Sequence, residues 1–382
     1  MSFNRILHLP QLLEKKSFFL FGSRSTGKSY LIREQLGNAL VLDLLRTELY
    51  FRLSNRPSEL EALIEGASQR ANVVVIDEVQ KIPQLLDEVH RLIEEKNIIF
   101  LLTGSSARKL KRGQANLLAG RAWTAYLFPL CWPEIKNFDL NRYLRYGGLP
   151  NVYQNPFPEE ELDAYVQTFL KEEILVEGLI RKLPPFSRFL KAAALSTGQP
   201  LNLTQIASDC QVPASTVREH YSILEDTLVG FFLEPWTRSQ KRKAAQTAKF
   251  YFFDPGVTHT LTGTKTLDRN SNLYGASFEQ FIGMELRAYL SYRRIKEPLS
   301  FWRSLHGYEV DFVVGDHTAI EVKDTQRVSQ YDMKGLKALK EEAVFKEYYL
   351  ISQDPIEMKK DGVTVIYWEN FLKKLWEDQL FV

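Results

Sequence analysis

Residues 22–29 have the composition and spacing of a loop that binds the phosphates of a nucleotide. They match the pattern G-x-x-x-x-G-K-[ST] between an apolar run at 18–21 and a helix-like run at 30–36, the context in which this motif binds phosphate. Glycines let main-chain N–H groups approach phosphate oxygens, and the start of the helix adds partial positive charge. We expect Lys28 to reach the outer phosphates of ATP and Ser29 to hold Mg²⁺. The complete predicted loop is Gly22, Ser23, Arg24, Ser25, Thr26, Gly27, Lys28 and Ser29.

Two acidic residues follow a second apolar run, at 73–76. A continuous apolar run is typical of a parallel strand that is buried on both faces. Asp77 lies where this strand ends, so we expect it to support the Mg²⁺ of ATP through water. Glu78 is the residue that we expect to polarise the attacking water, because hydrolysis needs a water in line with the γ-phosphate.

Hydroxyl groups end a third strand-like segment, which starts at Asn97 and is apolar over 98–102. Ser105 is the predicted sensor that hydrogen-bonds the γ-phosphate or the water, with Thr103 and Ser106 as alternatives. In the competing interpretation, Ser105 or Ser106 caps a helix that starts at residue 107. The sequence favours neither interpretation.

Arg121 precedes a further strand-like segment, at 122–127. A guanidinium can stabilise charge on the transferring phosphoryl group, from the same chain or from a neighbouring subunit. Arg121 is therefore a candidate arginine finger, and a surface or interdomain ion pair is the alternative. An arginine that acts between subunits requires a homo-oligomer, for which a hexameric ring is one arrangement.

A second set of charged residues has the pattern of a Mg²⁺-dependent nuclease. Two strand-like segments joined by a turn bring Asp311 and Glu321 to neighbouring strands, and Lys323 shares a face with Glu321. This D…E-x-K pattern is the core of restriction-endonuclease-like folds. Two carboxylates can hold Mg²⁺ beside a phosphodiester, Lys323 can orient the water, and Glu279 on a preceding helix adds a carboxylate. Cleavage and simple binding both remain open, because the acids alone do not show turnover.

The middle of the chain predicts a helix-turn-helix. Residues 203–210 and 214–226 read as two short helices around a tight turn, and residues 231–236 and 248–253 read as the strands of a wing. Such a module either contacts DNA or serves only in packing. The predicted DNA-contacting residues are Ser215, Thr216 and Arg218 in the second helix, and Arg238, Lys241, Arg242 and Lys243 between the strands.

Alternating strands and helices in the first part of the chain predict an open parallel sheet, with the nucleotide at the carboxyl ends of its strands. We therefore expect an α/β chain with three parts. These are a P-loop NTPase domain over 1–142, a helical and winged helix-turn-helix-like region over 143–255, and a restriction-endonuclease-like domain over 256–382.

Composition and charge limit the class of protein, the kind of partner and the compartment that we expect. The chain has 382 residues, 45% of them hydrophobic and 25% charged, as in ordinary globular proteins. Its net charge of +2 means that affinity for nucleic acid must come from local patches. Cys131 and Cys210 form no disulfide or zinc pattern. The first residues lack a signal-peptide core, and no apolar run approaches the roughly 18 residues of a membrane span, so we expect a cytoplasmic protein without a membrane partner.

The chain resembles bacterial AAA-type ATPases that carry a C-terminal domain of unknown function with a restriction-endonuclease-like core. The resemblance covers nearly the whole length. The phosphate loop and the Asp77-Glu78 pair are its motifs specific to nucleotide hydrolysis. The other matching segments have no chemistry that the sequence assigns, and they are Thr103 to Arg108, Ala119 to Arg121, Phe128 to Leu130 and Tyr146 to Pro150.

Two functions fit these observations. In the first, ATP hydrolysis is coupled to DNA binding or processing, by translocation, remodelling or cleavage. In the second, the protein is a nucleotide-controlled switch in defence or signalling, and its nuclease-like domain only binds a partner. Stimulation of ATP hydrolysis by DNA favours the first function, and ATP-dependent assembly that is indifferent to DNA favours the second.

Overall fold

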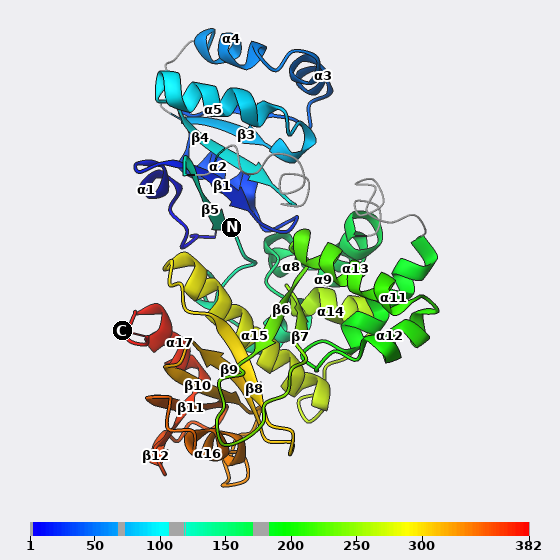
Figure 1. Ribbon diagram of the computed structural model, residues 1–382, viewed down its shortest axis with the longest axis vertical. Coiled ribbons are helices and arrows are strands. Elements are labelled where there is room, and N and C mark those ends of the chain that lie inside the picture. The colour runs from blue at the N-terminus through cyan, green and yellow to red at the C-terminus, as the bar shows by residue number, and fades with distance from the viewer. Residues whose placement is uncertain (1–2, 68–72, 107–117, 119, 171–182, 382) are drawn as a thin grey trace. The chain divides into compact units, whose positions relative to one another are not determined.

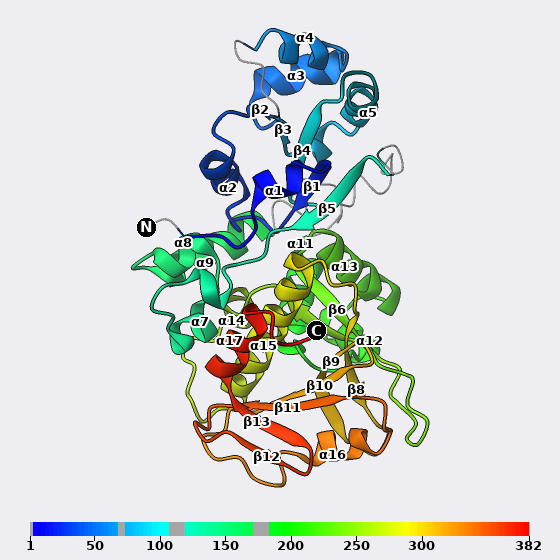
Figure 2. The ribbon, with the colours of Figure 1, turned by 90° about the vertical axis from the view of Figure 1, so that its left-hand side faces the viewer.

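The computed structural model describes residues 3–67, 73–106, 118, 120–170 and 183–381. The chain divides into two compact units. The N-terminal unit comprises residues 2–130 and 226–229, and the C-terminal unit comprises residues 131–225 and 230–382. Each unit has a β-sheet of its own (Figures 1 and 2).

The N-terminal unit contains one parallel sheet of five strands in the order β2-β3-β4-β1-β5, so the predicted open parallel sheet is confirmed. The strands are β1 (Ser17–Phe21), β2 (Leu40–Asp43), β3 (Val73–Asp77), β4 (Ile99–Gly104) and β5 (Ala122–Tyr126). The helices are α1 (Leu9–Leu13), α2 (Lys28–Gln35), α3 (Thr47–Asn55), α4 (Glu59–Glu65) and α5 (Leu85–Lys96), with a 3₁₀ turn η1 (Val79–Lys81).

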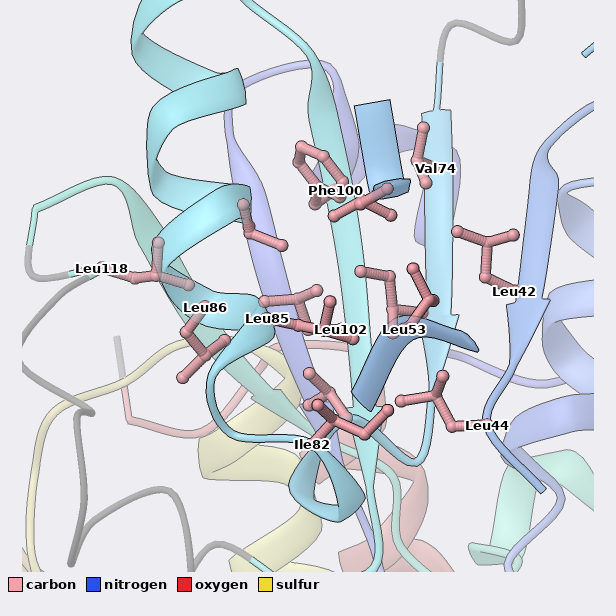
Figure 3. Packing of buried hydrophobic residues seen from close by; sticks show 14 of the residues in the cluster. Leu42, Leu44, Leu53, Val74, Ile82, Leu85, Leu86, Phe100, Leu102 and Leu118 are labelled. Carbon is pink, nitrogen blue, oxygen red and sulfur yellow. The ribbon is translucent and has the colours of Figure 1, made fainter. Parts of the chain in front are cut away.

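An apolar cluster fixes this sheet against its helices. Alternate residues of a strand point to the same face, so Phe100 and Leu102 of β4 lie beside Val74 of β3. Figure 3 shows these side chains against Leu85 of α5 and Leu53 of α3, and all five are fully buried. Truncation of one such leucine to alanine costs about 2–5 kcal/mol. The cluster therefore holds the carboxyl ends of β3 and β4, where the predicted nucleotide residues lie, in a fixed relation.

The C-terminal unit contains a mixed sheet of eight strands in the order β12-β13-β11-β10-β9-β8-β6-β7. The predicted hairpin of β9 and β10 is confirmed as an antiparallel pair. The strands are β6 (Gly230–Pro235), β7 (Lys249–Phe252), β8 (Leu299–Arg303), β9 (Glu309–Val314), β10 (Thr318–Val322), β11 (Glu347–Ser352), β12 (Met358–Lys360) and β13 (Val363–Tyr367).

The predicted helices of the helix-turn-helix are confirmed as α12 (Leu203–Cys210) and α13 (Ala214–Asp226). The Asn202 side chain caps α12 by accepting from the N–H of Gln205 at 3.0 Å, and Gln211 ends it in the left-handed region. The other helical segments of this unit are η3 (Trp132–Glu134), α7 (Leu140–Tyr146), α8 (Pro150–Gln154), α9 (Pro158–Ala164), η4 (Tyr165–Leu170), α11 (Leu183–Leu195), α14 (Pro255–Thr262), α15 (Asn272–Tyr292), α16 (Lys334–Lys340) and α17 (Trp368–Trp376).

The two strands that were expected to form a wing belong to the large sheet. β6 and β7 pair antiparallel, as a wing requires, but β6 also pairs in parallel with β8 through Glu234 and Pro235. The predicted boundary between residues 255 and 256 therefore falls within a region that shares one sheet. Long-range pairing of this kind leaves no local signal, because the side-chain pattern of a strand reflects which of its faces are buried and not which strand lies beside it.

The structure gives a packing reason for the tyrosine-glycine-glycine segment at residues 146–148. The Asp254 carboxylate is fully buried, and it accepts from the N–H groups of Gly148 at 2.8 Å and Val257 at 3.1 Å. Gly147 has φ +76°, and a Cβ there would overlap the same carboxylate. Burial raises the pKa of Asp254 to about 6, although these N–H groups oppose that shift. The segment thus joins α7 to the start of α14.

Among the described helices, none combines the length and the apolar character that crossing a bilayer demands.

Candidate functional site

The phosphate loop connects β1 to α2, and its glycines are required by its shape. Gly27 caps α2 with φ 93°, a conformation that other residues rarely adopt. A Cβ on Gly22 would lie 2.5 Å from the carbonyl oxygen of Leu127. Ser25 also has a positive φ of 62°, and the Thr26 hydroxyl donates to the Ser23 carbonyl at 2.8 Å. The loop is therefore a tight turn closed by its own hydrogen bonds.

Lys28 folds back over this loop. Its Nζ donates to the carbonyl oxygens of Gly22 at 2.7 Å and Ser23 at 3.1 Å, and its side chain is buried. The ammonium group is thus held above the turn that precedes α2. An anion at the helix start would meet this positive charge together with the partial charge of the helix.

The two predicted Mg²⁺ residues contact each other. Ser29 Oγ donates to Asp77 Oδ2 at 3.1 Å, and the Thr103 hydroxyl donates to the other oxygen of the Asp77 carboxylate. This contact joins the start of α2, the end of β3 and the end of β4. Hydroxyl and carboxylate oxygens are the ligands that Mg²⁺ prefers, so Ser29 and Asp77 fit the expected ion.

Hydrogen bonds to both its main chain and its carboxylate hold Glu78 in place. Its backbone is left-handed, with φ 61°, and its N–H donates to Thr103 Oγ1 at 3.2 Å. Its carboxylate accepts from Ser105 Oγ at 3.3 Å and from the Gln80 side-chain amide. The structure thus brings together Asp77, Glu78 and the hydroxyls of two predicted sensor candidates.

Gln80 is a member of this site that the sequence analysis missed. Its side chain is 3% exposed, and its Nε2 also donates to Ser105 Oγ at 3.2 Å. A Cβ on Gly104 would lie 2.6 Å from Gln80 Oε1, so this glycine makes room for the amide. The available signal was the position of Gln80 two residues after Glu78, where a 3₁₀ turn folds its side chain back toward the acid.

Two serines of the N-terminal unit bind a short segment from far along the chain. Ser23 Oγ donates to the carbonyl of Leu228 at 2.6 Å, and Ser106 Oγ donates to that of Asp226 at 3.4 Å. Leu228 also packs against the core cluster. Ser106 therefore contacts this segment, residues 226–229, and the helix that Ser105 or Ser106 was expected to cap lies outside the described residues.

Arg121 has an acidic partner in its own unit. Its Nε lies 2.5 Å from Glu94 Oε1, and the arginine side chain is 37% exposed. This pair corresponds to the ion-pair alternative, and it leaves the guanidinium at a surface. The role of Arg121 as an arginine finger stays a prediction.

The nuclease-like residues meet in the C-terminal unit. Lys323 Nζ lies 2.6 Å from Glu321 Oε1 and 4.0 Å from Asp311 Oδ2, and Asp311 Oδ2 accepts from the N–H of Val322 at 2.8 Å. Asp311 and Glu321 are both buried. Burial and then the neighbouring Asp311 charge raise the pKa of Glu321 well above its usual range.

Glu279 belongs to a second part of this cluster, which contains a lysine that the sequence analysis missed. Lys249 on β7 is 1% exposed, and its Nζ lies 2.6 Å from Glu309 Oε1 and 3.4 Å from Glu279 Oε1. Tyr251 donates to Glu279 Oε1 at 2.5 Å. Burial lowers the pKa of Lys249, but Glu279, Glu309 and Asp311 together raise it above its ordinary value. A lone lysine in a strand carries no sequence signal of such a role.

The cluster fits a metal ion only through two carboxylates. Among the described residues, no group of three or more His, Cys, Asp or Glu side chains is arranged to hold a metal. Glu321 Oε2 is nevertheless buried without a hydrogen-bond partner, so this carboxylate has an oxygen available to a cation. Asp311 and Glu321 would hold the predicted Mg²⁺, and the remaining ligands would have to be water or phosphate.

The predicted DNA-contacting residues lie in two settings. On α13, Ser215 and Arg218 are exposed and Thr216 is half-buried. Between β6 and β7, Arg238 pairs with Asp316, and Arg242 pairs with Glu341 at 2.7 Å. The main-chain N–H groups of residues 240–242 in this segment, including that of Lys241, donate to the Glu342 carboxylate. Lys243 is exposed. The basic segment is thus partly neutralised within its own unit.

Comparison with known families divides the chain in three. Residues 14–136 match a family model described as an AAA domain. Residues 137–268 and 274–371 match two domains of unknown function, DUF8612 and DUF4143. The AAA match and the five-stranded parallel sheet together show that the N-terminal unit has a P-loop NTPase fold of the AAA type. No match extends this conclusion to the nuclease-like cluster.

Curated relatives include an uncharacterized protein of Mycobacterium tuberculosis, Rv2008c, which is 29% identical over 68% of this chain. The chain spans 60% of the length of that relative and of its counterpart in Mycobacterium bovis. An uncharacterized protein of Methanocaldococcus jannaschii, MJ1637, is 22% identical over 94% of this chain and 85% of its own length.

Similar solved structures include the Aeropyrum pernix ORC1 protein in complex with DNA and the Bacillus subtilis DNA clamp loader delta protein. The first has a TM-score of 0.30 and 12% identity, and covers 68% of this chain and 93% of its own. The second has a TM-score of 0.25 and 13% identity, and covers 56% of this chain and 86% of its own. Similarity at this level carries no information on function.

Proposed function

We propose that this protein hydrolyses ATP with Mg²⁺ in its N-terminal unit and couples turnover to the binding or processing of DNA. The observation that carries the proposal is the contact of Ser29 with Asp77, which joins the phosphate loop to the acidic pair at the end of β3. This pair of oxygen ligands beside a lysine-bearing loop is the arrangement that phosphoryl transfer needs.

Each side chain has a role that follows from its position. The amides of residues 22–29 and Lys28 would bind the phosphates, while Ser29 and Asp77 would hold the Mg²⁺, which would neutralise charge on the phosphates. Glu78 orients the attacking water, and Ser105 lies beside the Glu78 carboxylate, where it senses the γ-phosphate or that water. Gln80 keeps Glu78 in this orientation through its amide.

The segment 226–229 supports the coupling part of the proposal. It continues directly from α13 and leads directly into β6, which belongs to the sheet of the other unit. Its carbonyl groups are held by Ser23 of the phosphate loop and by Ser106 at the end of β4. A shift of either serine when ATP binds would therefore pull on the chain between α13 and β6.

Arg121 extends the proposal to an oligomer. Its partly exposed guanidinium pairs with Glu94, which is itself 53% exposed, so this pair is weak enough to exchange for the phosphates of a neighbouring subunit. Turnover per subunit that rises with protein concentration, and that Arg121→Ala removes, is the expected result. Turnover that is independent of concentration and of Arg121 contradicts this role.

The second candidate is a nucleotide-controlled switch whose C-terminal unit only binds a partner. The pairing of Lys323 with Glu321 and of Lys249 with Glu279 favours it, because these cations offset the charge of acids that a nuclease would present to metal. Mg²⁺-dependent strand cleavage that Asp311→Ala abolishes would exclude this candidate.

ATP turnover measured with single-stranded, duplex and branched DNA, and scored for strand cleavage in the same samples, tests these proposals. We expect Mg²⁺-dependent turnover that one form of DNA stimulates. Glu78→Gln should retain bound ATP with turnover reduced about 100-fold, as expected for loss of the group that orients water. Absence of ATP binding and phosphate release would refute ATP hydrolysis, and turnover unchanged by every DNA would refute the coupling.

A further inference from the structure

The N-terminal unit has a buried arginine beside its phosphate loop that the proposed function does not use. Arg5 is 8% exposed, and its Nη1 donates to the carbonyl oxygen of Thr26 at 2.9 Å. Its Nη2 donates to the carbonyl oxygen of Phe128 at 2.6 Å. A guanidinium is a rigid planar fork, so the bond to Phe128 fixes the direction from which Nη1 reaches Thr26. Arg5 therefore ties the loop to the chain that follows β5.

The chain after β5 is a firm anchor for this fork. The N–H of Leu127 donates to the carbonyl of Phe21 at 2.7 Å, which continues the pairing of β5 with β1. The carbonyl oxygen of Leu127 lies so close to Gly22 that a Cβ on this glycine would be 2.5 Å away. Residues 127–128 thus follow the start of the phosphate loop, and Arg5 connects them with its end.

The segment that carries Arg5 is also held at the far end of α2. Gln35, the last residue of α2, accepts from the N–H of Leu9 at 2.7 Å and donates to the carbonyl of Leu7 at 3.1 Å. Leu7 and Leu9 are both buried. Residues 5–9 therefore contact the loop before α2 and the end of α2, so the main chain of Arg5 has a fixed position.

The bond from Arg5 to Thr26 sets the orientation of the peptide group between Thr26 and Gly27. This peptide is trans, and a trans peptide points its C=O and N–H groups to opposite sides. With the Thr26 carbonyl held by Arg5, the N–H of Gly27 points away from the arginine. The Thr26 hydroxyl donates to the Ser23 carbonyl, so the side chain of Thr26 opposes rotation as well. In a loop of this kind the main-chain N–H groups are the donors that surround the phosphates.

We propose that Arg5 is a positioning residue of the nucleotide site and holds the N–H of Gly27 in the direction of the phosphates of ATP. This inference rests on the proposed binding of ATP by residues 22–29. A donor to phosphates that stay bound throughout the reaction stabilises the ground state and the transition state alike, so its loss raises KM and leaves kcat nearly unchanged. Loss of a residue that serves only the fold reduces the amount of active enzyme, which lowers apparent kcat at constant KM.

The test is steady-state ATP hydrolysis by Arg5→Met, with binding of ADP in the presence of Mg²⁺ measured by isothermal titration calorimetry well below the unfolding temperature. We expect KM for ATP and Kd for ADP to rise about 10-fold, the loss of one hydrogen bond to a charged group, with kcat nearly unchanged. Arg5→Lys keeps the charge without the fork that reaches two carbonyls, so both constants should rise by a smaller factor. This second variant carries the test if Arg5→Met does not fold.

Gln35→Met is the matched control, because it removes two hydrogen bonds between the same segment and the end of α2 without altering the loop. We expect a lower unfolding temperature and wild-type constants for ATP and ADP. Wild-type KM and Kd in both Arg5 variants, or a loss of kcat at constant KM, overturns the inference. An equal rise of both constants in Gln35→Met overturns it too, since the effect would then belong to the whole segment.

The wild-type protein distinguishes failure of this inference from failure of the proposed function. If wild type binds ADP and hydrolyses ATP while the Arg5 variants match it, only the role of Arg5 is refuted. If wild type neither binds ADP nor releases phosphate from ATP, both the role of Arg5 and the proposed ATPase are refuted.

Discussion

The nucleotide loop and the carboxylate cluster both gather charge, but they do so in different ways. The loop, with Asp77 and Glu78, takes its groups from contiguous segments at the ends of β1 and β3, and it leaves them in position for a ligand. The cluster takes its groups from three strands and one helix. Its cations, Lys249 and Lys323, are already paired with acids of the same unit.

The two arrangements differ in how strongly the stability of the fold depends on them. A loop at the edge of a sheet can be altered with little effect on the core beneath it. Buried charges depend on one another, because removal of one partner leaves the other without compensation in a medium of low polarity. Variants of the first site should therefore change chemistry, and variants of the second should change stability.

Lys28→Ala gives the largest expected effect and tests the first half of this contrast. Loss of the ammonium above the loop should lower kcat/KM for ATP by at least about 100-fold, as for removal of a group that stabilises charge in the transition state. Thermal unfolding should change little. Lys15→Ala, at an exposed position in the same unit, is the control. Normal turnover by Lys28→Ala would contradict the assignment of the loop.

Lys249→Met tests the second half of the contrast. The substitution leaves Glu279 and Glu309 without their shared cation, so we expect the free energy of unfolding to fall by about 3–5 kcal/mol. Urea unfolding followed by circular dichroism measures this change. Lys360→Met on β12 replaces an exposed lysine and should change stability by less than about 0.5 kcal/mol. Equal stability of the two variants would show that the cluster is not interdependent.

Glu285 is a further buried acid of the C-terminal unit, and its effect on the free energy of unfolding should depend on pH. This acid on α15 is 1% exposed and accepts from the N–H of Trp132 at 2.8 Å and from Trp376 Nε1 at 2.7 Å. Burial raises its pKa from 4.5 to about 8. The folded state then binds a proton that the unfolded state releases, so this residue should lower the free energy of unfolding as pH rises from about 4.5 to about 8.

The comparison of wild type with Glu285→Gln isolates this effect, because the amide does not titrate. We expect the stability of wild type relative to the variant to fall over that pH range when urea midpoints are measured at each pH. A constant difference across the range would show that Glu285 is not protonated in the folded protein.

Gln80→Leu gives the smallest expected effect and sharpens the description of the nucleotide site. Because Gln80 acts through Glu78, its loss should lower kcat about 10-fold and leave KM for ATP nearly unchanged, in keeping with loss of one hydrogen bond to a charged group. Gln84→Leu, at an exposed position nearby, is the control. A parallel rise in KM would indicate that Gln80 contributes to binding rather than to the orientation of Glu78.

Local motifs made the fold of the N-terminal unit predictable from the sequence. The glycine spacing of the loop, the acids after β3 and the apolar strands were all visible, and the parallel sheet that they predict is present. The hairpin that carries Asp311 and Glu321 was predictable for the same reason, since a short turn joins its two strands. The contacts of Gln80 and Lys249 could not be predicted, because neither residue type is distinctive and the partners of Lys249 lie on other elements.

The sequence by itself determined which groups we expect to bind phosphate and magnesium, because that chemistry depends on residue types held a few positions apart in one loop and one strand end. Only the tertiary structure decided that β6 and β7 join the sheet of β9 and β10, that residues 226–229 lie against Ser23 and Ser106, and that Lys249 pairs with Glu309. These contacts link segments up to 205 residues apart in the chain. Their free energy comes from burial and charge pairing between surfaces that meet only after folding, so no local pattern specifies them.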